Sequence, residues 1–205
     1  FEEWRLENPD APIDDFKFSL DKMSNSGALF DIMKFEDVSR EVLLRTPANK
    51  IYDEFSDWLK EYDPEFYKLF TRDKNYSEKI IDVGRNGNRP RKDLTSWKQA
   101  RDFFSFYFPE TFKVEDEFPE RVSKEDRYKI LKQYLTSFNI KDDNSEWFQK
   151  IRDITESMGY AVKPKDFKKN PDMYKGSVSD VSGVIRVAIT GRTNSPDLWE
   201  ICQII

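Results

Sequence analysis

The chain has 205 residues, of which 36% are charged and 38% hydrophobic, with a net charge of −5 and no histidine. Without an imidazole, Ser-His-Asp and Cys-His catalysis and the commoner zinc sites are excluded. The single cysteine, Cys202, excludes a disulfide framework and is typical of a reducing, cytoplasmic location. No apolar run approaches the roughly 20 residues of a membrane span. Acidic residues lie beside basic ones, as on a solvated surface, and this mixing disfavours a carboxylate-pair hydrolase.

A low glycine count and long amphipathic runs predict a mostly α-helical fold. Only seven glycines are present, and few glycines favour helices. Thr46-Pro47 and Asp63-Pro64 each resemble the start of a helix. Between them, the helix is expected to bury the face formed by Ile51, Phe55, Trp58 and Leu59. The many aromatic side chains are therefore interpreted first as core, with a base-stacking platform as the alternative.

A loop rich in glycine, asparagine and arginine covers residues 83–91 and precedes a helix expected over residues 94–108. Residues 84–101 carry six basic residues and one acid, although the chain as a whole is acidic. Guanidinium groups and free backbone N–H groups at a helix start suit phosphate. A solvated loop without a ligand explains the pattern equally well.

The second part of the chain shows a predicted linker, two capped helices and a second basic segment. Residues 109–119 are acidic and bounded by proline, which predicts a linker between two helical subdomains. Ser123 and the run Asp142-Asp143-Asn144 are expected to cap the next two helices, the second of which ends at Gly159. Residues 163–176 form another basic segment, with five lysines against two aspartates.

The final stretch, residues 176–205, contains one arginine inside an apolar run. Arg186 interrupts that run, which breaks at Gly191. Ser195 is expected to cap a last helix, with Pro196 in its first position and Asp197 near its positive end. Such an arginine beside a polar helix start suits contact with a nucleic-acid base. An arginine in an ion pair within a helical core explains the pattern too, and spacing alone favours that alternative.

Four stretches of the sequence resemble one family. The last one, G-x-V-x-D-V…I-R-V-A-I-T-G-R…S-P-D-L, is similar to the C-terminal anticodon-binding region of glutamyl-tRNA synthetases. Residues 1–5, 22–31 and 89–93 resemble the same family in the same order, so the resemblance covers essentially the whole chain. It implies a remnant that contacts the tRNA stem at residues 1–34, and two helical anticodon-binding subdomains at residues 35–118 and 119–205.

Lys22-Met23-Ser24-Asn25-Ser26 matches the class I synthetase signature K-M-S-K-S at four of five positions. Asn25 replaces the second lysine, which is expected to hold ATP phosphates, and the histidine-rich partner motif cannot exist here. The chain also begins without methionine and is expected to end within a helix. We therefore expect a fragment of a longer protein, whose separate catalytic domain uses ATP and Mg²⁺, and no catalytic residue, metal or cofactor within these residues.

The resemblance implies binding to the anticodon arm of tRNA(Glu), and neither to DNA nor to a membrane. Arg186 matches an arginine that reads an anticodon base, Ser195 and Leu198 match neighbouring contacts, and Arg89 or Arg91 matches an arginine of the first subdomain. Phosphate contacts are expected from Lys92, Lys165, Lys168, Lys169 and Lys175. Two alternatives stay open: a glutaminyl-tRNA synthetase region, and a helical protein-interaction module whose basic loops only aid solubility.

Overall fold

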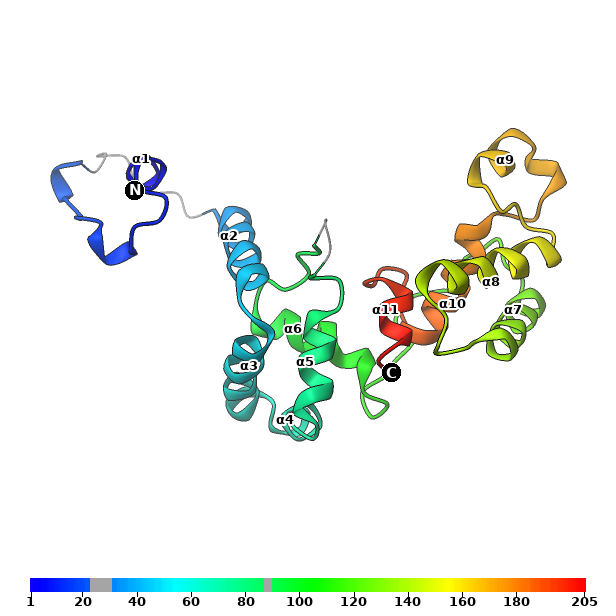
Figure 1. Cartoon of the computed structure of the whole chain (residues 1–205), viewed down its shortest axis with the longest axis horizontal. Helices are drawn as coiled ribbons and strands as arrows, with labels where there is room; N and C mark the ends of the chain where they lie inside the picture. The colour runs from blue at the N-terminus through cyan, green and yellow to red at the C-terminus, as the bar shows by residue number, and fades with distance from the viewer. Residues whose placement is uncertain (23–30, 87–89) are drawn as a thin grey trace. The chain divides into compact units, whose positions relative to one another are not determined.

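The structure is a computed structural model that describes residues 1–22, 31–86 and 90–205. These residues form eleven α-helices and four short 3-10 helices and contain no β-strand, which confirms the predicted mostly α-helical fold (Figure 1). They divide into two compact units, Phe1–Met33 and Lys34–Ile205. None of the helices found in the described ranges has both the length and the apolar character needed to cross a membrane.

The smaller unit contains α1 (Glu2–Glu7) and two 3-10 turns, η1 (Ile13–Asp15) and η2 (Leu20–Lys22). The Arg5 guanidinium donates to the carbonyl oxygen of Ala11 at 2.7 Å and thereby ties α1 to the following turn. The rings of Phe1 and Trp4 both pack against Phe16, with centroids 5.2 and 5.4 Å away. Residues 23–26, which make up most of the predicted K-M-S-N-S motif, lie outside the described residues.

The first half of the larger unit surrounds an aromatic core, called here the first core. Its helices are α2 (Ile32–Arg45), whose first two residues fall in the smaller unit, α3 (Ala48–Tyr62), α4 (Pro64–Phe70), α5 (Lys74–Asp82), α6 (Trp97–Phe104) and η3 (Ser105–Tyr107). Phe55 is fully buried and its ring lies 4.9 Å from Phe70 and 5.9 Å from Phe104. The prediction that these aromatics form a core is confirmed. Helix α6 begins at Trp97, later than predicted, because Ser96 caps it.

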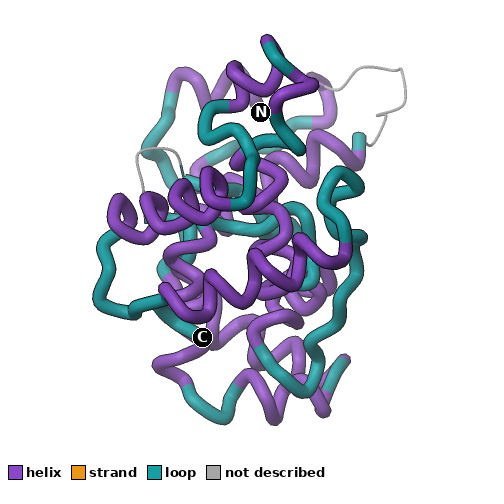
Figure 2. The backbone as a smooth tube through the Cα atoms, turned by 90° about the vertical axis from the view of Figure 1, so that its right-hand side faces the viewer, coloured by secondary structure: helices purple, strands orange, loops and turns teal. Residues whose placement is uncertain are grey.

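A second core forms where α7 (Lys124–Ser137), α8 (Asn144–Ser157) and α10 (Val178–Thr190) pack together (Figure 1). Figure 2 shows the described backbone as helices joined by loops. Between α8 and α10 lie α9 (Pro164–Lys169) and η4 (Pro171–Met173), and α11 (Leu198–Cys202) follows α10. The predicted cap at Ser123 is confirmed, since its hydroxyl accepts a backbone N–H of α7 at 3.1 Å. Of the run predicted to cap α8, Asp143 is the cap and accepts a backbone N–H at 2.8 Å. The predicted start of the last helix is wrong: Asp197 caps α11, and Ser195 lies before it.

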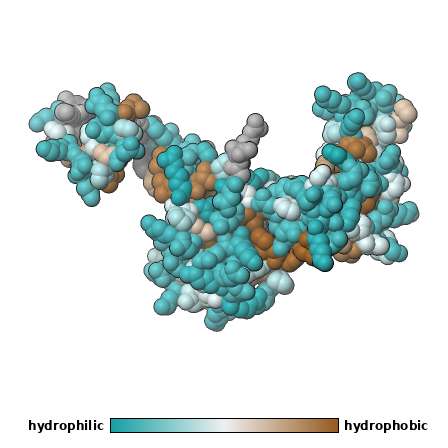
Figure 3. All heavy atoms as spheres, in the orientation of Figure 1, coloured by the Kyte–Doolittle hydropathy of each residue, from teal (hydrophilic) through white to brown (hydrophobic). Residues whose placement is uncertain are grey.

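Residues 109–119, called here the connecting segment, run between the two cores and are held in place. The N–H groups of Glu115 and Asp116 both donate to the carbonyl of Gly191, at 2.8 and 3.0 Å. Ile201 of α11 lies in the first core, and Ile189 of α10 packs against both cores. The face drawn in Figure 3 is mostly hydrophilic, with a few apolar patches. The predicted linker is thus an ordered segment. The predicted boundary between the two helical subdomains at residue 118 stays a prediction.

Candidate functional site

Arg186 lies on α10 and is fixed through one nitrogen. Its Nη1 donates to the hydroxyl of Ser195, to the Ser195 carbonyl at 3.1 Å and to the Pro196 carbonyl at 2.9 Å. Nε and Nη2 form no hydrogen bond with the described residues, and neither is among their buried unpartnered atoms, so both reach the surface. The side chain is half-buried. The guanidinium is therefore anchored on one nitrogen and presents a two-donor edge outward.

These partners differ from the ion pair that spacing alone favoured. All three acceptors of Arg186 are neutral oxygen atoms. Burial lowers the pKa of the Arg186 guanidinium from its ordinary value; Asp197 opposes this effect and the charge of Arg91 adds to it. An arginine remains protonated in proteins, so the outward edge carries positive charge without a bound carboxylate.

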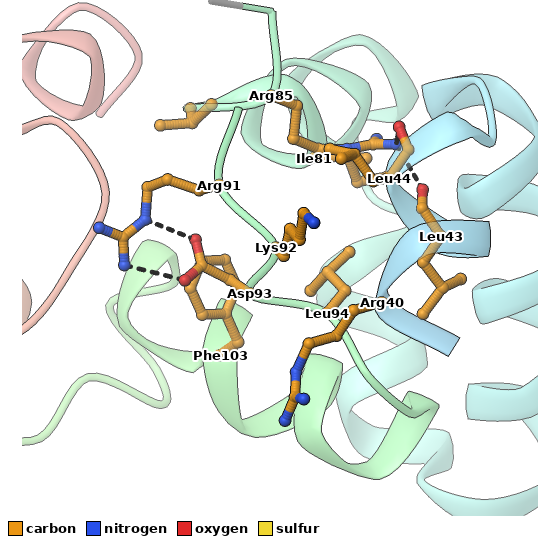
Figure 4. A pocket seen from close by; sticks show the side chains of 11 residues that line it. Arg40, Leu43, Leu44, Ile81, Arg85, Arg91, Lys92, Asp93, Leu94 and Phe103 are labelled. Carbon is orange, nitrogen blue, oxygen red and sulfur yellow. Dashed lines mark hydrogen bonds and ion pairs between the residues drawn. The ribbon is translucent and has the colours of Figure 1, made fainter. Parts of the chain in front are cut away.

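Arg91 contacts the same turn from the first half of the larger unit. Its Nε and Nη2 donate to the two carboxylate oxygens of Asp93 at 2.7 and 2.8 Å, as Figure 4 shows, and its Nη2 reaches Asn194 Oδ1 at 3.4 Å. The hydrogen bond with Asp93 raises the pKa of Arg91. Because Asn194 precedes Ser195, the two arginines flank one turn, residues 194–196, and repel each other. In Arg91 the two-donor edge is occupied, so only Nη1 and the flat face remain for a ligand.

Gly84 makes two further contacts, one to α11 and one within the loop that carries Arg91. The Gly84 N–H donates to Glu200 Oε2 of α11 at 2.7 Å, and the Gly84 carbonyl accepts from the Arg91 N–H at 2.8 Å. A Cβ on Gly84 would lie 3.1 Å from the Arg91 Cδ and 3.6 Å from the Pro196 Cβ, so the backbone approaches both sides of the site closely. The site is therefore built jointly from the two halves of the larger unit.

Ser195 and Leu198 were predicted as base contacts, and both are buried, at 6% and 3% exposure. The Ser195 hydroxyl holds Arg186, and Leu198 packs in the second core. A contact between the Leu198 side chain and a base would require that side chain to leave the core. The buried position of Leu198 indicates that it supports the turn at residues 194–196. Arg89, the alternative to Arg91, lies outside the described residues.

Comparison with curated proteins shows to which family the chain belongs. Glutamate–tRNA ligases match along the whole chain: that of Acetivibrio thermocellus is 53% identical over 205 residues, that of Clostridium perfringens strain 13 is 41% identical over 209, and that of Sorangium cellulosum is 38% identical over 207. The chain belongs to the glutamate–tRNA ligase family. It matches the C-terminal part of these relatives and spans 36–38% of their length.

No protein-family model matches the chain. The relatives support the glutamate ligase interpretation of the sequence and not the glutaminyl alternative. In the described parts of this ligase region, no group of three or more acidic or cysteine side chains is placed to hold a metal ion. The expectation that it needs neither metal nor cofactor stays a prediction.

Much of the positive charge that residues 84–101 contribute to this ligase region is neutralised within the protein. Lys92 is paired with Glu41 of α2, whose pKa is lowered by that contact. Arg101 donates to Asp63 at 2.8 Å. Arg85 is paired with Asp82 at 3.8 Å, and its Nη2 donates to three backbone carbonyls at the end of α2. Counting basic residues in the sequence therefore overestimates the positive charge near Arg91 that is not paired within the protein.

The second basic segment is different. Its base is closed by the Ala161 N–H, which donates to the Gly176 carbonyl at 2.9 Å, and by the Val178 N–H, which donates to the Ala161 carbonyl at 2.8 Å. Lys175 is paired with the buried Asp126 at 3.0 Å. The three lysines of α9 are exposed and have no ion pair within the described residues: Lys165, Lys168 and Lys169.

Sequence reasoning missed Arg192 and Asp93. Asp93 binds the functional edge of Arg91, and Arg192 donates to Glu115 of the connecting segment at 2.8 Å. The only signal for Arg192 was the Gly-Arg pair that ends the apolar run, and nothing near it in the chain indicates its partner.

Proposed function

We propose that the chain grips the anticodon arm of tRNA(Glu) and that its unpaired bases meet Arg186 and Arg91. The observation that carries this proposal is the anchored Arg186, which presents an open two-donor edge beside a second arginine. Unpaired bases expose their hydrogen-bonding edges and stack on guanidinium planes, so paired arginines beside a turn suit them.

Family membership supports the same proposal. The relatives are glutamate–tRNA ligases, and the chain spans less than two fifths of their length. We infer that the chain acts as the tRNA-binding part of such a ligase in the cytoplasm. Activation of glutamate with ATP and Mg²⁺ then belongs to a catalytic domain outside these residues.

The candidate residues divide into base contacts and supports. Arg186 donates through Nε and Nη2, while Arg91 contributes Nη1 and its flat face. Ser195 and Leu198 hold the turn. Arg89 remains a candidate from the family resemblance. Phosphates are contacted by the exposed α9 lysines first, and by the two ion-paired lysines only if their pairs open: Lys92 and Lys175.

Binding measurements with a changed anticodon test the proposal. The affinity of the chain for tRNA(Glu) and for the same tRNA with substituted anticodon bases is compared for wild type and Arg186→Ala. A residue that reads a base is worth about 1–3 kcal/mol of discrimination, so the variant should lose about five- to 150-fold in the ratio. Arg152→Ala, an exposed arginine on α8, is the charge-matched control and should keep the ratio.

Two results would contradict the proposal. A wild type that does not distinguish the anticodons, or an Arg186→Ala variant that keeps full discrimination, removes the assignment. Salt separates tRNA binding from the protein-interaction alternative, because each phosphate contact on a single strand makes log affinity fall by about 0.7 per unit of log salt. A flat salt response would indicate a protein partner.

A further inference from the structure

Arg192 follows α10 and reaches across to the first half of the larger unit. Its Nε and Nη2 donate to the two carboxylate oxygens of Glu115 at 2.8 and 3.2 Å. Nη2 also donates to the Asp102 carbonyl at 2.7 Å and to the Ser105 hydroxyl at 3.2 Å. The guanidinium lies 5.8 Å from the Phe106 ring, and the side chain is only 18% exposed.

The residues on either side of Arg192 add to this attachment. The Gly191 carbonyl accepts the N–H groups of Glu115 and Asp116. The N–H and hydroxyl of Thr193 both donate to Asp116 Oδ2, at 2.6 and 2.7 Å. Residues 191–193 therefore clamp the end of α10 to the connecting segment and to the end of α6.

Both sides of the candidate site are attached to this clamp. Asn194 and Ser195, which contact Arg91 and Arg186, follow Thr193 directly. Residues 90–96 with Arg91 lead into α6, whose last turn supplies the Asp102 carbonyl to Arg192. Charge-assisted, bidentate arginine–carboxylate pairs fix geometry as well as adding energy. The position of one arginine relative to the other thus depends on this contact.

We propose that Arg192 is a positioning residue, which sets the turn at residues 194–196, and with it Arg186, at the correct place relative to Arg91. The proposal rests on the proposed function. Arg192 itself is a poor contact for RNA, because Nε and Nη2 are both used by protein acceptors and Glu115 balances its charge. It acts through Arg186 and Arg91.

Two substitutions separate geometry from charge. Arg192→Lys keeps the positive charge, but one ammonium group cannot replace a planar fork that meets Glu115, Asp102 and Ser105 together. We therefore expect Arg192→Lys and Arg192→Ala both to lower the ratio of affinities for tRNA(Glu) and the anticodon-substituted tRNA by about tenfold, which is about 1.4 kcal/mol. Adding Arg192→Lys to Arg186→Ala should cause little further loss in the ratio, because the two residues act together.

Arg72→Ala is the matched control, since it removes an exposed arginine paired with Glu110 of the same connecting segment. That variant should keep the wild-type ratio. An unchanged ratio in both Arg192 variants would overturn the proposal, and so would full recovery in Arg192→Lys, which would assign the effect to charge. Far-UV circular dichroism shows whether each variant keeps its helices.

Hydrogen exchange tests the clamp independently of the proposed function. If the wild type does not distinguish the two tRNAs, the proposed function fails, and the clamp is judged by hydrogen exchange alone. Faster exchange of the Glu115 and Asp116 amides in Arg192→Lys than in wild type supports the clamp, because both amides bond to Gly191. Unchanged exchange of these amides contradicts it.

Discussion

The attachment of the connecting segment to the end of α10 predicts a large effect for Gly191→Ala. Gly191 has φ +73°, and a Cβ there would lie 1.9 Å from the carbonyl oxygen of Lys113, a backbone atom that cannot rotate away. A left-handed alanine costs about 1–2 kcal/mol. Moving the segment also breaks the bonds from Glu115 and Asp116 to Gly191, each worth about 0.5–1.5 kcal/mol. The free energy of unfolding should fall by about 2–5 kcal/mol in total.

Gly159→Ala is the matched control for this prediction. Gly159 has φ +77°, and nothing lies within 4 Å of a Cβ built there. It therefore measures the conformational cost alone, about 1–2 kcal/mol. Urea unfolding at pH 7 gives both values. If the two variants lose the same stability within about 0.5 kcal/mol, the connecting segment is not held against Gly191 and the reasoning is refuted.

Three further predictions concern stability and phosphate contacts. Burial would raise the pKa of Asp126, but the hydrogen bonds from Lys175 and Tyr160 outweigh burial and lower that pKa. The stability that these hydrogen bonds add at neutral pH is therefore lost as the pH falls below about 4. Asp126→Asn should be less stable by about 1–3 kcal/mol at pH 7 in urea unfolding, with a gap that narrows towards pH 3; a constant gap would contradict this. Asp143→Ala removes a capping box and should lower the unfolding free energy by about 0.5–2 kcal/mol, so an unchanged melting temperature would argue against it. Glutamine at all three α9 lysines should weaken binding to both tRNAs equally and reduce the salt slope by about 0.7 per contact, whereas an anticodon-selective loss would exclude a phosphate role for Lys165, Lys168 and Lys169.

Local signals in the sequence predicted the helices well. The caps at Asp63, Ser123 and Asp143 depend on hydrogen bonds over three residues, which the sequence displays directly. The start of the last helix was wrong because the Ser195 hydroxyl binds Arg186 of the preceding helix, and Asp197 caps α11 instead. A side chain with a competing tertiary partner is the case in which cap statistics fail.

The site was predictable only in part, since its geometry depends on long-range pairs. Arg186 was identified from its place in an apolar run and from the family resemblance. The partner of Arg192 lies 77 residues away, and that of Lys92 lies 51 residues away, so neither contact has a signature along the chain. Counting charges in a window therefore identified a basic segment but not which of its charges are neutralised.

We propose that the anticodon of tRNA(Glu) lies between Arg186 and Arg91 when the chain binds it. Chemical footprinting of tRNA(Glu) bound to the chain tests it most directly, with Arg186→Ala as the comparison. We predict protection of the three anticodon nucleotides by the wild type and its loss at one or more of them in the variant. Protection confined to other parts of the tRNA, or an identical footprint for both proteins, would contradict binding of the anticodon by Arg186.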